Sequence, residues 1–149
     1  GIPEGRRIKA IMPAGASSSL IVATEEALDT PMDYESVPKV GAQLGSASVI
    51  VIDDSVSIAW LLNKTMHFFK HESCGKCTPC REGTYWMLHL TERIAGGQAT
   101  QEDVDLLRSV AGQVKNKCLC ALGESSIEAV LTGLERFPQD FSERVSAAK

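Results

Sequence analysis

Cysteine is the residue type in this sequence whose number and spacing could do chemistry. Three cysteines stand at three-residue intervals in the stretch ESCGKCTPCREGT: Cys74, Cys77 and Cys80. Two more follow in KCLCALG: Cys118 and Cys120. Five is an odd number, so disulfides would leave one thiol over, and thiols three residues apart are too crowded to pair with one another. The arrangement therefore indicates a metal site rather than a disulfide framework.

The spacing also bears on the kind of metal. A site with four thiolate ligands suits either an iron–sulfur cluster or structural zinc. Zinc sites more often use two separated C-x-x-C pairs, whereas one C-x-x-C-x-x-C run with a remote fourth cysteine is typical of a [4Fe–4S] cluster. Two-cluster ferredoxins continue with C-x-x-x-C-P, but REGT follows Cys80 here. The sequence thus predicts one cluster, favours iron–sulfur over zinc, and leaves open whether Cys118 or Cys120 completes it.

The neighbours of the cysteines favour a loop that curls round one centre. Pro79 argues against a single helix through all three positions, and Gly75 frees the backbone to turn beside the first sulfur. Three basic residues lie next to ligand positions and are placed to offset negative charge: Lys76, Arg81 and Lys117.

Two other groups of residues are weaker candidates for a role in this chemistry. The histidines are expected in packing or surface roles rather than as ligands: His67, His71 and His89. The large aromatic residues are expected in the core rather than in an electron path: Trp60, Tyr85 and Trp86. No side chain is required as an acid, base or nucleophile.

The elements that must position the cysteines fall into two parts. Residues 1–53 are rich in Gly, Pro, Ala and Ser, and short β-like runs predict strands at 6–12, 19–24 and 47–53. Over residues 54–149, apolar residues recur at three- and four-residue steps, which predicts four helices with short connections. The expected fold class is therefore α+β, with a β-rich domain at 1–53 and an antiparallel four-helix bundle at 54–149.

Capping signals predict where these helices begin and end. Asp54 or Ser55 is expected to cap the first helix, and the second follows the cysteines and ends at Gly96. The third is expected over 101–116. Its N-cap is Thr100, and the fourth begins after CALGES with a capping box formed by Ser125 and Glu128.

Composition excludes several classes of function. The 149 residues carry a net charge of −4 with a pI near 5.4 and no basic stripe, which argues against nucleic-acid binding. No apolar run reaches the roughly 18 residues of a spanning helix, and the start lacks the apolar core of a signal peptide. Nothing in the sequence indicates secretion. It has no initiator methionine, and we expect it to be a piece of a longer polypeptide.

The cysteine motif and its surroundings resemble a known family. ESCGKCTPCREGT with the later CALG is similar to the C-terminal portion of the NADH-binding flavoprotein subunit of respiratory complex I. IKAIMPAGASSSLI, LDTPMDYES and GAQLGSASVIVIDD resemble the small β-grasp (SLBB-like) domain that precedes the iron–sulfur bundle in that family. The resemblance covers most of the chain. It implies a partial β-grasp (SLBB-like) unit followed by a four-helix bundle that carries one iron–sulfur cluster.

The resemblance also implies a ligand set. The family's fourth ligand aligns with Cys120, so it implies Cys74, Cys77, Cys80 and Cys120 as the ligands of one [4Fe–4S] cluster and leaves Cys118 as a small packed thiol. MPAGASSS is not a dinucleotide-binding fingerprint. The FMN and NADH sites are therefore expected upstream of Gly1.

The implied function is that of an electron-transfer module of an NADH:quinone oxidoreductase, on the cytoplasmic or mitochondrial-matrix side and peripheral to the membrane complex. Single electrons from FMN would pass through the cluster to iron–sulfur centres of partner subunits, namely the small [2Fe–2S] subunit and the large iron–sulfur subunit. The same module in a soluble NAD-linked hydrogenase or formate dehydrogenase is one alternative. A zinc-stabilised interaction module is an alternative of another class.

Overall fold

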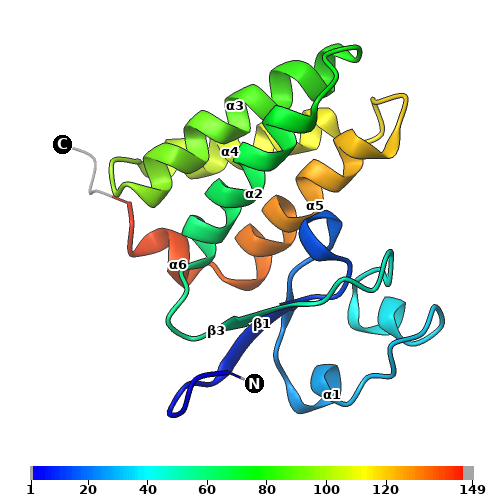
Figure 1. The fold of residues 1–149 in the computed structure, drawn as a ribbon. Helices are drawn as coiled ribbons and strands as arrows, with labels where there is room; N and C mark the ends of the chain where they lie inside the picture. Colours follow the sequence, from blue (N-terminus) through cyan, green and yellow to red (C-terminus); the bar gives the residue numbers. More distant parts are fainter. Residues whose placement is uncertain (1, 146–149) are drawn as a thin grey trace.

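The computed structural model describes residues 2–145 and begins with a small antiparallel sheet (Figure 1). Its strands are β1 (Ile8–Met12), β2 (Ile21–Val22) and β3 (Ile50–Asp53), in the spatial order β2-β1-β3. Short helical turns occupy the connections: η1 (Gly15–Ser17), α1 (Glu25–Leu28) and η2 (Val37–Val40). The three predicted strands are confirmed, although the second is only two residues long.

The second part of the chain is helical, as predicted. Its longer helices are α2 (Ile58–Glu72), α3 (Thr78–Ala95), α4 (Gln101–Val114) and α5 (Ala121–Arg136), and the short α6 (Gln139–Ser142) follows. Helix α3 packs between α2 and α4, and α5 contacts both α2 and α4 (Figure 1). The fold is therefore α+β. Within residues 2–145, no helix combines the length and apolar character needed to cross a membrane.

One hydrophobic core joins the sheet to the helices. Ala10, Met12 and Ile52 of the sheet lie in the same buried cluster as the inward faces of the helices. Four buried apolar residues of α2 recur at three- and four-residue steps, as predicted: Ala59, Leu62, Met66 and Phe69. A division of the chain at residue 53 into two domains stays a prediction.

The start of α2 is held by a residue far away in the sequence. Asp140 accepts hydrogen bonds from Lys9 Nζ at 2.6 and 2.8 Å and from the backbone N–H of Ile58 at 2.6 Å. The helix N-cap is Ser57, so the prediction of Asp54 or Ser55 was wrong by at least two positions. The reason is that the carboxylate of Asp140, distant in the sequence, accepts a hydrogen bond from an N–H group of the first turn. A side chain at the N-cap normally accepts such a bond.

The other predicted helix ends have mixed outcomes. Thr100 is the N-cap of α4, and Asp103 accepts a hydrogen bond from its backbone N–H at 2.8 Å, as a capping residue does. Helix α3 ends at Ala95 with Gly96 as its C-cap, as predicted, whereas α4 stops at Val114, two residues short of the prediction. The Ser125 capping box is wrong, because α5 already begins at Ala121.

Three large aromatic residues of α2 and α3 lie outside the core. Trp60, Tyr85 and Trp86 are 48%, 43% and 53% exposed, so the prediction that they pack inside was wrong. They lie on the outward faces of α2 and α3, and other side chains fill the inward faces of these helices. Trp60 instead carries the ammonium group of Lys64 over its ring, 5.4 Å from the ring centroid.

Candidate metal centre

The first three cysteines lie where α2 ends and α3 begins. Cys74 follows the end of α2, Cys77 is the N-cap of α3, and Cys80 is in the first turn of α3. Pro79 is accommodated in that first turn because N–H groups there have no partner within the helix. No single helix runs through the three cysteines, as predicted, and the loop holds Cys74 and Cys77. The prediction that the helix follows all three cysteines was wrong, because Pro79 fits the first turn and α3 already includes Cys80.

Several contacts fix this loop. Gly75 has φ of +77°, a left-handed conformation that glycine adopts readily. The guanidinium of Arg81 donates a hydrogen bond to the Gly75 carbonyl at 2.8 Å. Ser73 Oγ lies 3.4 Å from the sulfur of Cys80 and accepts a hydrogen bond from the Gly75 N–H at 3.4 Å. The cysteine loop is thus tied back to the first turn of α3.

The second cysteine segment connects α4 to α5. The chain turns at Asn116, which has φ of +60°, and the Asn116 N–H donates to the Glu124 carboxylate at 2.5 Å. The backbone N–H of Leu119 then donates to the sulfur of Cys77 at 3.3 Å. This bond spans 42 positions of sequence and brings the two cysteine segments into direct contact.

All five thiols line one pocket of about 170 Å³, together with Glu72, Lys76 and Leu122. They are free thiols, so each sulfur remains able to bind metal. The structure thus brings together the four residues predicted as ligands, and Cys118 with them. As they stand, no three histidine, cysteine, aspartate or glutamate side chains of residues 2–145 form a group that could hold a metal ion.

Cys118 and Cys120 differ in their surroundings. Cys120 is exposed and is the N-cap of α5. Cys118 is half-buried, and its sulfur lies against Gly123, where an added Cβ would be only 2.4 Å from it. Burial raises the pKa of the Cys118 thiol, and the neighbouring thiols of Cys80 and Cys77 raise that pKa further. Cys118 is therefore the more packed thiol and Cys120 the more accessible one.

Two helix N-termini adjoin the pocket. Cys77 is the N-cap of α3 and Cys120 is the N-cap of α5. The first N–H groups of a helix carry partial positive charge, which stabilises a nearby thiolate or other anion. An iron–sulfur cluster with four thiolate ligands is negatively charged. The thiol ligands of this pocket and the partial positive charge of the two helix N-termini therefore fit such a cluster.

The histidines make other contacts. His67 and His89 each lie near the carboxylate of Glu92, at 3.4 and 3.1 Å, and His71 lies 2.9 Å from the carboxylate of Glu72. None of them lines the thiol pocket. The contacts of Ser73 and of the Leu119 N–H with the cysteines were not predicted, because a hydroxyl beside a motif and a backbone group carry no distinctive sequence signal.

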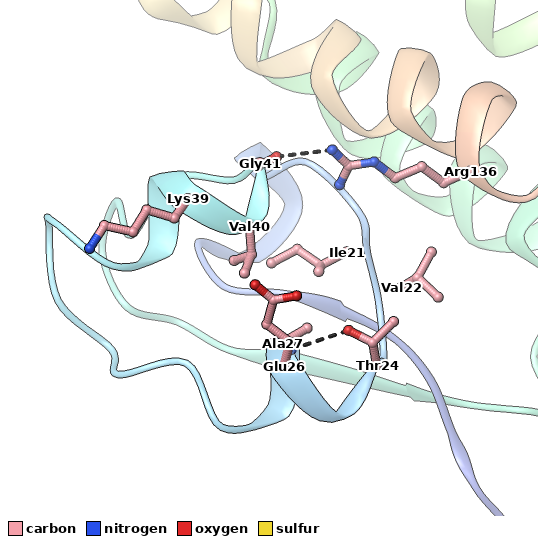
Figure 2. Close-up of a pocket in the computed structure, with 9 residues that line it drawn as sticks. All are labelled: Ile21, Val22, Thr24, Glu26, Ala27, Lys39, Val40, Gly41 and Arg136. Atoms are coloured by element: carbon pink, nitrogen blue, oxygen red, sulfur yellow. Dashed lines mark hydrogen bonds between the residues drawn. The ribbon is translucent and has the colours of Figure 1, made fainter.

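A larger cavity, of about 470 Å³, lies between the sheet region and the end of α5 (Figure 2). Arg136 reaches into it and donates to the carbonyl oxygens of Leu20 and Gly41, at 2.6 and 3.3 Å. The ammonium group of Lys39 points away from Arg136 in Figure 2. The contacts of Arg136 thus tie α5 to the β2 and η2 segments, and no cysteine or histidine lines this cavity.

Comparison with known proteins assigns the family. The model of the NADH-ubiquinone oxidoreductase-F iron-sulfur binding region matches residues 60–144. This chain belongs to that family. The match confirms the predicted [4Fe–4S] cofactor and spans the whole cysteine constellation. The curated relatives belong to the same family that the sequence motifs of this chain resemble.

The relatives are longer than this chain. It is 37% identical over 141 residues to the F subunit of the NADH-quinone oxidoreductase of Mycobacterium tuberculosis, covering 95% of this chain and 31% of that protein. It is 36% identical to the corresponding protein of Streptomyces coelicolor, of which it covers 32%. Among solved structures, an NAD⁺-reducing [NiFe]-hydrogenase matches 95% of this chain and 24% of its own, with a TM-score of 0.84 and 30% identity.

Proposed function

We propose that this chain is the electron-transfer region of the NADH-binding flavoprotein in an NADH:quinone oxidoreductase, with one [4Fe–4S] cluster on Cys74, Cys77, Cys80 and Cys120. The cluster, when bound, takes up and releases one electron at a time. The observation that carries this proposal is the gathering of two distant cysteine segments around one pocket. Hydrophobic packing alone does not explain why five thiols from two distant segments line the same pocket.

The residues of the chain have distinct roles in this proposal. The α2–α3 loop supplies three thiolates, and the start of α5 supplies the fourth from Cys120. The Leu119 N–H directs a hydrogen bond at the sulfur of Cys77, which stabilises negative charge there and favours the reduced state. Cys118 packs against Gly123 and binds no iron.

The wider assignments belong to this proposal as well. The sheet region and α2–α5 correspond to a partial β-grasp (SLBB-like) domain and an antiparallel four-helix bundle, divided near residue 53. FMN and NADH would bind a part of the protein that this chain does not include, because the chain spans about a third of the relatives it matches. The small [2Fe–2S] subunit and the large iron–sulfur subunit would be the partners, on the cytoplasmic or matrix side of a membrane complex.

Metal and sulfide analysis tests the proposal directly. The full-length protein, purified without oxygen, is expected to contain four irons and four acid-labile sulfides per cluster-bearing region, and its reduced form is expected to give an EPR signal. One zinc ion with no sulfide in a colourless protein would instead support a zinc-stabilised interaction module.

A second function has one observation in its favour. The NAD⁺-reducing [NiFe]-hydrogenase has the same fold over this region, with 30% identity. The same electron-transfer module would then serve a soluble NAD-linked hydrogenase, and formate dehydrogenase is the related alternative. Affinity purification of the full-length protein with its partners distinguishes these functions. Quinone reduction by NADH in the isolated complex supports the first, and hydrogen- or formate-dependent reduction of NAD⁺ supports the others.

A further inference from the structure

Two charged side chains of opposite sign lie in the wall of the thiol pocket. Glu72 is the last residue of α2, and Lys76 lies in the loop between Cys74 and Cys77. Both are exposed at the surface while lining the pocket. The pocket therefore has one cation and one anion beside its thiols.

The other two basic residues that adjoin a cysteine in the sequence have side-chain partners of their own. Arg81 donates to the Gly75 carbonyl and to the carboxylate of Glu82, both at 2.8 Å. Lys117 donates to the side chain of Gln113 at 2.8 Å. Lys76 makes no hydrogen bond or ion pair with any other residue of the described chain, 2–145. Its ammonium group is thus available to the pocket itself.

We propose that Lys76 raises the reduction potential of the cluster and that Glu72 lowers it. This inference rests on the proposed function. On reduction the cluster gains one electron from the reductant, no bond forms or breaks, and the site becomes more negative by one charge. A neighbouring ammonium group stabilises that extra charge, and a neighbouring carboxylate opposes it. Nearby charge is one of the means by which a protein adjusts such potentials.

The two effects are expected to differ in size. The Glu72 carboxylate has a neighbour that does not line the pocket, the Nδ1 atom of His71 at 2.9 Å. Lys76 has no such partner within residues 2–145. Since both side chains reach solvent, both effects are expected to be modest and to shrink as salt is added. The larger shift should therefore follow the loss of Lys76.

A redox titration monitored by EPR tests the inference on the full-length protein holding its cluster. K76Q is expected to shift the midpoint potential to more negative values, and K76R is expected to keep the wild-type value because it keeps the charge. E72Q is expected to shift the potential in the opposite direction by a smaller amount. K39Q removes the same charge from the N-terminal part of the chain, away from the thiol pocket, and is expected to leave the potential unchanged.

The outcomes separate this inference from the function on which it rests. Equal midpoint potentials for wild type and K76Q, with equal iron and sulfide contents, would overturn the role of Lys76 and leave the electron-transfer proposal standing. Loss of the cluster in K76Q but not in K76R would also overturn it, since Lys76 would then be needed for assembly. A wild-type protein without iron and sulfide would refute the proposed function itself.

Discussion

The contact between α3 and α4 near the cysteines depends on one glycine. Gly83 is buried in α3, and a Cβ built there would lie 2.2 Å from Cγ2 of Val114, near the end of α4. Gly83 stands three residues after Cys80, and Val114 stands four residues before Cys118. We expect Gly83→Ala to push the two helix ends apart, and with them the two cysteine segments.

The expected change in the free energy of unfolding for Gly83→Ala follows from two opposing contributions. Alanine in place of glycine in a helix interior stabilises the folded state by about 1 kcal/mol. Forcing an extra methyl group into a filled site costs about 1–3 kcal/mol, and the upper end applies here. Val114 is buried and β-branched, so its side chain cannot rotate away cheaply. The net expectation is a loss of about 1–2 kcal/mol, which lowers the melting temperature by about 2–8 °C for a chain of this size.

The chain offers a matched control in the next helix. Gly112 lies in α4 with nothing within 4 Å of the place where its Cβ would be. Gly112→Ala should therefore stabilise the protein by about 0.5–1 kcal/mol. Val114→Ala removes the clashing methyl group, so the double variant with Gly83→Ala should lose less stability than the two single variants together, by about 1 kcal/mol.

Urea denaturation followed by circular dichroism measures these differences, and iron content reports on the cysteine site. Gly83→Ala should load less iron than wild type, and the double variant should load more than Gly83→Ala alone. A Gly83→Ala variant as stable as Gly112→Ala would refute the reasoning. Strict additivity in the double variant would refute it as well, because the predicted coupling comes from that one contact.

Three further predictions concern the cysteines and the start of α2. Cys120→Ser should lower the iron and sulfide contents strongly while Cys118→Ser leaves them near wild type, and the reverse result would assign the fourth ligand to Cys118. In the cluster-free reduced chain, iodoacetamide should modify Cys118 more slowly than exposed Cys74, because burial raises the Cys118 pKa and the thiolate is the nucleophile. The ratio of the two rates should approach one as the pH is raised, and equal rates at pH 7 would contradict the prediction. Asp140→Asn should cost about 1–3 kcal/mol in urea denaturation, because Lys9 loses its carboxylate partner, and unchanged stability would show that the pair contributes nothing.

The sequence predicted much of this arrangement because local patterns determine it. The three-residue cysteine spacing, Pro79 and Gly75 together required a loop followed by a helix start. The apolar period identified the helices, and Thr100 marked the start of α4. These signals act within one or two turns of chain, where neighbouring residues decide the conformation.

The wrong predictions concern features that local sequence patterns do not determine. Asp140 bonds to the start of α2 across 82 positions, and no local pattern reveals it. Helix α5 begins directly after Cys120, although cysteine is not a preferred capping residue, so Ser125 gave the stronger local signal. Trp60, Tyr85 and Trp86 were assigned to the core by their type alone, but the faces that they occupy on α2 and α3 point outward.

Packing gives an argument for Cys120 over Cys118 as the fourth ligand that is independent of the CALG motif. The sulfur of Cys118 occupies the space left by the missing side chain of Gly123 and lies 3.9 Å from the Val114 carbonyl oxygen. Turning it toward a cluster would open a void of about one methyl group, at a cost of about 1 kcal/mol. Cys120 is already exposed at the start of α5, so its thiolate can turn to iron without losing a packed contact, and it remains beside the positive end of that helix.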